Sequence, residues 1–149
     1  MNGNQFISGT LTFSNGWSLP SDVAENMDCP GCAAGEVVVV DPDHDQRVKP
    51  SRRAYDGTVA GVISEMPTLH IGGSRWETAK PLALAGQVRC KVTAENGPIK
   101  RGDLLVSSST PGYAMRGAVE KIQPGMLVGK ALEPLAEGEG TILVLITGG

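Results

Sequence analysis

Two segments of this chain read alike at a distance of about 67 residues, close to half of its 149 residues. Each segment begins with Gly, an acidic residue and an apolar run: "GEVVV" from residue 35 and "GDLLV" from residue 102. Each then passes through a turn-rich stretch to a second apolar run that contains a Gly: "VAGVI" from residue 59 and "LVGKA" from residue 127. A Gly inside a strand marks a bulge or a close approach of two backbones. We therefore predict a duplicated unit of short strands, at about 35–64 and 102–133.

The composition favours short strands and tight turns over long helices. The chain has 20 Gly and 10 Pro, and only 4% of its residues are aromatic. Short β-branched or Leu-rich runs bounded by Gly, Pro, Asn or Asp recur along it, and the best helical candidate, 23–27, spans one or two turns at most. We expect an all-β fold in which the duplicated unit forms a small barrel or sandwich, with few or no long helices.

Charge and hydropathy argue against several kinds of partner. The formal net charge is −3, so the overall charge favours neither nucleic acid nor an anionic membrane, and we expect neither as a partner. No apolar run approaches the length of a membrane span, and "ILVLI" at 142–146 fits a buried strand. The basic run at 47–53 is interrupted by Pro50 and is interpreted as a solvated loop. No secretory signal opens this chain, so we expect it to be made in the cytoplasm.

Two of the three cysteines lie in "CPGC", at Cys29 and Cys32. This is the spacing of half a zinc site or of a thiol-redox pair. A structural zinc site needs two more ligands, whereas Cys90, His44 and His70 are scattered, and a redox pair is expected in a βαβ context. Two interpretations stay open: a turn with two ordinary or mutually oxidised thiols, and a metal- or redox-linked domain through this pair. We expect no cofactor.

The acidic stretch "DPDHDQ" places Asp41, Asp43 and Asp45 at the first, third and fifth positions of a calcium loop. Gln46 stands where that loop needs Gly, and Arg52 where it needs Glu, so an acidic hairpin loop is predicted instead. The chain has no phosphate-binding loop, GxSxG or HExxH motif, and only two His residues. We therefore expect no enzyme that acts on an external substrate.

The stretch "SDVAEN" from Ser21 is the place where the chain could act on its own backbone. In a tight turn or a single helical turn, the Glu25 carboxylate would fold back over the Ser21–Asp22 bond. A carboxylate whose pKa is raised by packing can serve as the base in hydrolysis, and Asp22 could bond the departing amine or share a proton with Glu25. Ser21 is equally a good N-cap for a turn with two solvated acids. Local chemistry alone favours the capped turn.

The span from Ser21 to the C-terminus resembles a family of β-rich terminal domains. These domains occur at the ends of phage neck appendages, tail spikes and tail fibres, and in related bacterial surface proteins. The resemblance rests on "SDVAEN", "GEVVVVDPD", "SRRAYDGTVAGVIS", "PLALAGQVRCKVTAENGPIKRGDLLVSSSTPGYAMR" and "GKALEPL". It implies an intramolecular chaperone that helps three chains to assemble and then releases itself by cutting its own backbone. The family motif Ser-Asp-x-x-Glu implies cleavage between Ser21 and Asp22, with Asp22 and Glu25 as the catalytic acids.

The resemblance leads to one main expectation and two alternatives. Residues 21–149 are expected to be a terminal assembly domain of a phage, prophage or surface fibre protein that promotes homotrimer formation, and residues 1–20 a lead or the remnant of an upstream fibre. Its partners would be its own copies and the upstream fibre or spike segment, on a virion tail or appendage or on a bacterial cell surface. The first alternative is an active, single-turnover self-cleaving peptidase that uses Ser21, Asp22 and Glu25. The second is the metal- or redox-linked domain through Cys29 and Cys32.

Overall fold

The computed structural model describes residues 22–65, 67, 69–71 and 77–146, so Ser21 and the predicted lead at 1–20 lie outside the described residues. About half of the described residues are strand, which confirms the predicted all-β fold. The elements are β1 (Asp22–Asp28), β2 (Val37–Val40), β3 (Val48–Pro50), β4 (Val59–Val62), β5 (Leu69–Ile71), β6 (Ala79–Thr93), β7 (Leu104–Ser107), β8 (Ala114–Arg116), the 3-10 turn η1 (Val119–Lys121), β9 (Leu127–Ala131) and β10 (Glu139–Ile146). Within the described part of the chain, no helix is long and apolar enough to cross a membrane.

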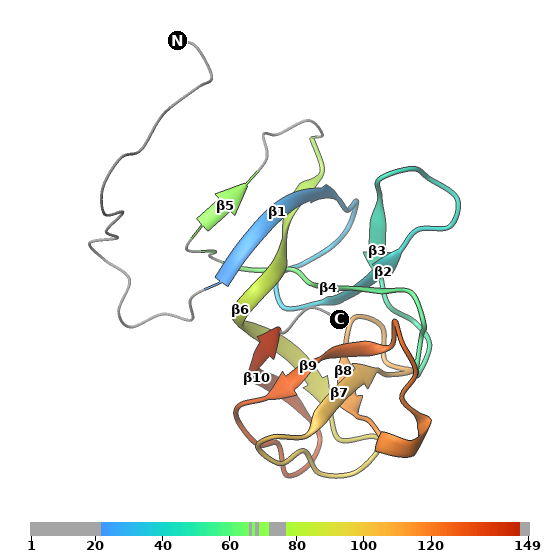
Figure 1. The fold of residues 1–149 in the computed structure, drawn as a ribbon, viewed down its shortest axis with the longest axis vertical. Helices are drawn as coiled ribbons and strands as arrows, with labels where there is room; N and C mark the ends of the chain where they lie inside the picture. Colours follow the sequence, from blue (N-terminus) through green and yellow to red (C-terminus); the bar gives the residue numbers. More distant parts are fainter. Residues whose placement is uncertain (1–21, 66, 68, 72–76, 147–149) are drawn as a thin grey trace, which may run out of the picture.

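Five strands close into a small barrel in the lower part of Figure 1. Their order is β6-β8-β7-β9-β10, and the barrel closes because β10 pairs with β6 as well as with β9. The inward side chains of these strands form the larger core cluster, which includes Val92, Leu105 and Val144, each fully buried. The apolar run at 142–146 is part of β10, as predicted.

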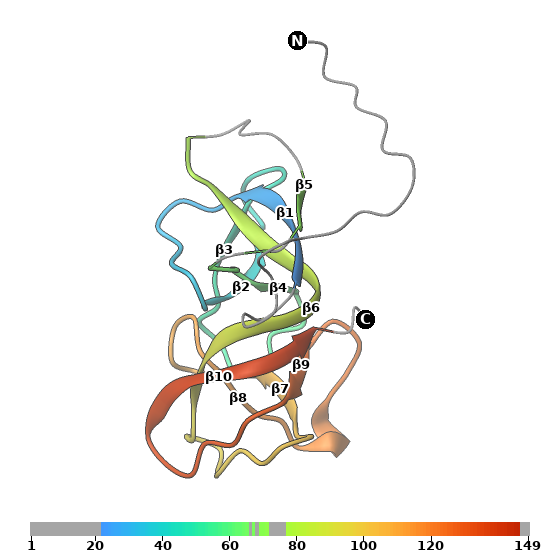
Figure 2. The same cartoon turned by 90° about the vertical axis from the view of Figure 1, so that its left-hand side faces the viewer.

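A second unit repeats this arrangement with fewer hydrogen bonds. The sheet β3-β2-β4 is joined to the N-terminal half of β6 by a bridge between Ile63 and Leu82, and to the end of β1 by a bridge between Asp28 and Arg47. β1 in turn pairs with β6, and β5 adds an outer parallel strand to β1. The order of strands around this unit, β1-β3-β2-β4-β6, therefore matches the order β6-β8-β7-β9-β10 around the barrel. Figure 2 shows β6 running through both units.

The two Gly-containing strands predicted from the repeat make the same kind of bulge. Val38 pairs with Gly61 beside a register shift between β2 and β4, and Leu105 pairs with Gly129 beside a shift between β7 and β9. A Cβ on Gly129 would lie 2.5 Å from the Leu145 carbonyl oxygen, which leaves no room for a side chain. The predicted duplicated unit is thus confirmed at the level of strand pairing.

Two local predictions are wrong. The helical candidate at 23–27 lies inside β1, because β5 and β6 pair with it on either side and satisfy its backbone as a strand. The basic run at 47–53, predicted as a solvated loop, includes β3, and only Arg47 and the residues after Pro50 stay outside the strand. The partners of β1 lie more than 40 residues further along the chain, so local pattern did not indicate them, whereas β3 pairs with β2 in a hairpin.

Candidate functional site

The extended conformation of β1 separates the two acids of the "SDVAEN" stretch. Asp22 lies at the start of the strand and is 3% exposed, whereas Glu25 is exposed and pairs opposite Leu82. A strand rises by about 3.3 Å per residue, which puts the two Cα atoms roughly 10 Å apart. The turn that was expected to bring Glu25 back over the Ser21–Asp22 bond is therefore not formed within one chain. Ser21 lies outside the described residues, and the catalytic roles of Ser21, Asp22 and Glu25 stay predictions.

Asp22 has an unusual environment for a carboxyl group. Burial raises the pKa of Asp22, and a hydrogen bond with the Ser64 side chain opposes that shift in part. Its Oδ2 atom has no hydrogen-bond partner among the described residues. A buried oxygen without a partner disfavours the ionised form, in the same direction as the raised pKa. Ser64 was missed by sequence reasoning, because it lies 42 positions further along the chain and nothing in the sequence links it to Asp22.

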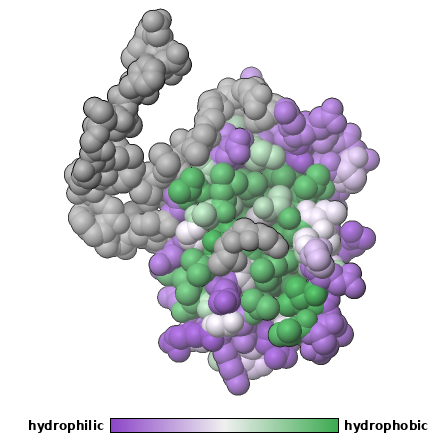
Figure 3. Space-filling model, in the orientation of Figure 1, coloured by the Kyte–Doolittle hydropathy of each residue, from purple (hydrophilic) through white to green (hydrophobic). Residues whose placement is uncertain are grey.

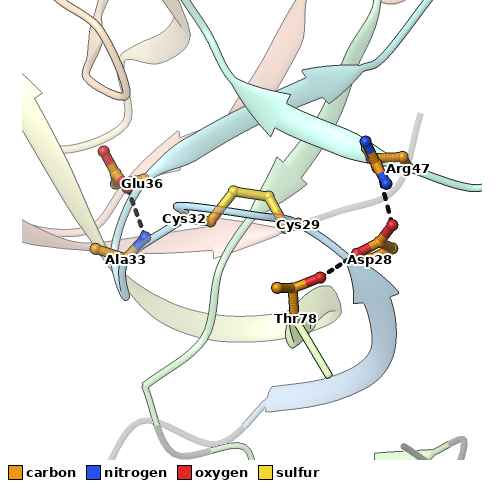
Figure 4. Close-up of a disulfide and its surroundings, with 7 residues drawn as sticks. All are labelled: Asp28, Cys29, Cys32, Ala33, Glu36, Arg47 and Thr78. Atoms are coloured by element: carbon orange, nitrogen blue, oxygen red, sulfur yellow. Dashed lines mark hydrogen bonds and ion pairs between the residues drawn. A yellow bond between two sulfur atoms is a disulfide. The ribbon is translucent and has the colours of Figure 1, made fainter. Parts of the chain in front are cut away.

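Asp28, at the other end of β1, forms an ion pair with Arg47 that has a structural role (Figure 4). Arg47 Nε donates to Asp28 Oδ2 over 2.8 Å, and the Thr78 hydroxyl donates to Asp28 Oδ1. The hydrogen bond from Thr78 and the one from Arg47 lower the pKa of Asp28, so this carboxylate is ionised near neutral pH. Its role is to tie the end of β1 to the start of β3, where the two strands share one bridge.

The cysteines of "CPGC" form a disulfide directly after β1 (Figure 4). The Cα atoms of Cys29 and Cys32 are 5.5 Å apart, and both side chains are buried in the second core cluster with Val38, Ile63 and Leu82. Of the two interpretations left open, the structure forms the mutually oxidised pair. The described residues hold no group of three or more His, Cys, Asp or Glu side chains placed to bind a metal ion. A redox role for the pair stays a prediction.

The acidic stretch from Asp41 forms the loop of the hairpin between β2 and β3, as predicted. Asp41 Oδ1 accepts a hydrogen bond of 2.9 Å from the Asp43 backbone N–H, and Asp41 Oδ2 lies 3.1 Å from His44 Nδ1. The hydrogen bond from Asp43 and the proximity of His44 lower the pKa of Asp41 despite some desolvation. This carboxylate therefore stabilises its own loop.

An apolar surface lies on the outer side of β10 and β6. Ile142, Val144 and Ile146 point into the barrel, but the alternate residues Leu143 and Leu145 are also apolar and only half-buried. In an antiparallel strand with one face in water, these outward positions are usually polar. Leu84 of β6, at the register shift opposite β1, is 41% exposed. Figure 3 shows apolar side chains gathered across the face that carries β1, β6 and the barrel strands below them.

Comparison of the chain with models of protein families finds no family that matches, and comparison with curated proteins finds no match either. The apolar outer surface of β6 and β10 and the buried carboxyl of Asp22 are the two features that support a functional proposal.

Proposed function

We propose that this chain is a β-rich assembly module that forms a homotrimer at the end of a phage, prophage or surface fibre protein. The observation that carries the proposal is the set of apolar side chains left without full cover on β6 and β10: Leu143 and Leu145 of β10, and Leu84 of β6 just beyond their paired stretch. The resemblance of residues 21–149 to terminal assembly domains supports the fibre setting. A purely structural role also agrees with the expectation that the chain has no external substrate.

The energetics favour burial of this surface between copies. Apolar surface removed from water contributes about 25 cal/mol per Å², and small units with short strands bury less of their surface than larger domains do. Leu143 faces Arg89 and Leu145 faces Gln87 across the β10–β6 pair, so the apolar side chains are rimmed by polar ones. An apolar patch with a polar rim is typical of a protein–protein interface. Three copies around one axis would cover it in a closed ring.

Sedimentation equilibrium at several concentrations tests the trimer. The wild-type chain should have three times the chain mass of 15.5 kDa. Leu84→Glu combined with Leu145→Glu should yield monomers, because two buried carboxylates would have to lose their hydration at the interface. Val119→Glu is the matched control: Val119 is 70% exposed in η1, outside β6 and β10, and its substitution should leave the trimer intact. A wild-type chain that stays monomeric at every concentration would reject the proposal.

Self-cleavage between Ser21 and Asp22 is a second candidate function, and the environment of Asp22 is the observation that favours it. A carboxyl group whose pKa is raised, next to the predicted scissile bond, is better suited than an ordinary aspartate to donate a proton to the departing amine. Glu25 is too far from this bond within an extended β1, so the candidate requires β1 to rearrange or Glu25 to act between chains of the trimer. The second route makes cleavage dependent on assembly, whereas the first does not.

Intact mass spectrometry after incubation tests the second candidate. Wild type should lose residues 1–21, while Glu25→Gln and Asp22→Asn should stay intact. The trimer-breaking pair Leu84→Glu and Leu145→Glu should also stay intact if Glu25 acts between chains. An intact wild-type mass after prolonged incubation as a trimer would reject self-cleavage and leave the assembly proposal standing.

A further inference from the structure

A groove of about 390 Å³ lies along the β2–β3 hairpin and the loop that follows β3. Part of its lining is apolar and consists of Val39, Val40, Pro42 and Pro50. Val40 is 52% exposed, which is unusual for a large aliphatic side chain in a strand. The groove therefore offers an aliphatic surface that the fold itself does not cover.

The charged part of the lining is mainly cationic. It consists of Lys49, Arg52, Arg53 and the single acid Asp56. The Arg52 and Lys49 side chains form no hydrogen bond or ion pair with another described side chain, although Lys49 lies near enough to Asp41 to help lower the pKa of that carboxyl. The Arg53 side chain is 76% exposed although it pairs with Asp56. Because Asp56 is already paired, the groove presents a net positive charge to a ligand.

Asp56 holds in place the loop that carries Arg52 and Arg53. It is 6% exposed, and its Oδ1 accepts hydrogen bonds from the Thr58 backbone N–H at 2.8 Å and from the Thr58 hydroxyl at 2.6 Å. Its Oδ2 accepts from Arg53 Nη2 at 3.2 Å. The Asp56 N–H donates to Ser107 Oγ, which in turn donates to the Arg53 carbonyl oxygen. Arg53 is thus held at both its backbone and its guanidinium group.

Tyr55, between the arginines and Asp56, has a backbone conformation that bulky residues rarely adopt. Its φ is +55°, in the left-handed region. Its N–H donates to the Ser107 carbonyl oxygen over 3.1 Å, and its phenol oxygen accepts from the Ala118 N–H over 3.0 Å. Such strain persists only where the surroundings impose it, and it clusters at ligand-binding sites. The loop is therefore built to a fixed shape.

The duplicated unit provides an internal comparison. The register pairs Val38 with Pro50 in one unit and Leu105 with Arg116 in the other, so β3 and the loop after it correspond to residues 66 positions later. By this correspondence Met115, Ala118 and Val119 stand where the first unit has Lys49, Arg52 and Arg53. The same strand arrangement thus forms without the three cations, which indicates that folding does not require them.

We propose that this groove binds an acidic peptide segment of a partner protein, with its carboxylates on Arg52, Arg53 and Lys49 and its aliphatic side chains on Val40, Pro42 and Pro50. Guanidinium groups match carboxylates in charge and geometry. The lining contains no aromatic ring on which a sugar or a nucleic-acid base would stack. The chain as a whole carries a charge of −3, so an acidic peptide would be attracted only locally. This site goes beyond the assembly function and does not depend on it.

Fluorescence anisotropy of a labelled peptide, in which glutamate alternates with valine or leucine, tests the site on the full chain. Binding should saturate, and a peptide with lysine in place of glutamate should not bind. Arg52→Gln combined with Arg53→Gln should weaken binding at least about tenfold, since each lost charged hydrogen bond weakens affinity by roughly that factor. Arg101→Gln, which removes an exposed arginine outside the groove, is the matched control and should leave the affinity unchanged.

Two further variants separate the groove from general charge effects and from misfolding. Val40→Ser leaves the charge unchanged and should weaken binding about threefold through lost apolar contact. Arg52→Gln alone leaves the Arg53–Asp56 pair in place, so it tests the site even if the double variant fails to fold. The proposal is overturned if the wild-type chain shows no saturable binding of the peptide. It is also overturned if Arg101→Gln lowers the affinity as much as the double variant does, or if equimolar inorganic phosphate displaces the peptide fully.

Discussion

Asp22 combines burial with an oxygen that has no partner among the described residues. Its pKa is raised above the usual 3.8, so between 3.8 and the raised value the folded chain holds a proton that the unfolded chain has lost. Over that range stability falls as pH rises, and the full penalty remains at neutral pH. Asp22→Asn should therefore raise the free energy of unfolding at pH 7 by about 1 kcal/mol. Urea unfolding between pH 4 and pH 7 measures this gain, and an unchanged pH dependence in the variant would contradict it.

The residues of this candidate site show how far sequence reasoning reaches. Asp22 and Glu25 could be selected from "SDVAEN" as chemically capable, because residue type and spacing are local properties. Their separation by β1, the burial of Asp22 and its contact with Ser64 could not be predicted, because each depends on strands that pair from elsewhere in the chain.

At the scale of the strands, the bulges opposite Gly61 and Gly129 explain why the repeat could be recognised before the structure. Both bulges need a residue without a side chain at the same place in the unit, so the glycines recur in the sequence with the strands around them. The region at 23–27 carries no such glycine, and its helical interpretation failed because β5 and β6 pair with it on either side. The groove loop likewise could be recognised as basic, but its anchoring by Asp56 and Ser107 joins residues 51 positions apart.

Gly129→Ala tests the bulge directly. The added Cβ would lie 2.5 Å from the Leu145 carbonyl oxygen and 2.7 Å from Val144 Cγ1, so β9 would have to move away from β10. Overpacking of this kind should lower the free energy of unfolding by about 2 kcal/mol. Gly57→Ala is the matched control, because a Cβ there meets nothing within 4 Å. Equal stability of the two variants in urea unfolding would show that β9 tolerates the shift.

The disulfide should stabilise the junction between β1 and β2. Closing so short a loop restricts the unfolded chain by about 2 kcal/mol. Cys29→Ser combined with Cys32→Ser should lose that amount, and the reducing agent dithiothreitol should affect wild type but not the double variant. Burial raises the pKa of Cys90 to about 12, so Cys90 should not react in the folded chain. Thiol titration of the unfolded chain should count one free thiol before reduction and three after it, and three before reduction would contradict the disulfide.

At the scale of the whole molecule, assembly and folding should be linked. A trimer that unfolds to separate chains gains stability with concentration by mass action, by about 2 kcal/mol per chain for a hundredfold rise. That rise should increase the melting temperature of wild type by about 5 °C. The variant carrying Leu84→Glu and Leu145→Glu should melt at one temperature whatever its concentration. If the melting temperature of wild type does not change with concentration, the outer surface of β6 and β10 is not an oligomer interface.

The long strand β6 has a consequence for how the molecule can be divided. Its first half pairs with β1 and its second half with β10, and side chains from both halves enter the cores of the two units. A cut on either side of β6 would leave one fragment without this strand and expose its hydrophobic core to water. Neither half is therefore expected to exist alone, although the gene encodes the same motif twice. The two units are therefore expected to fold as one.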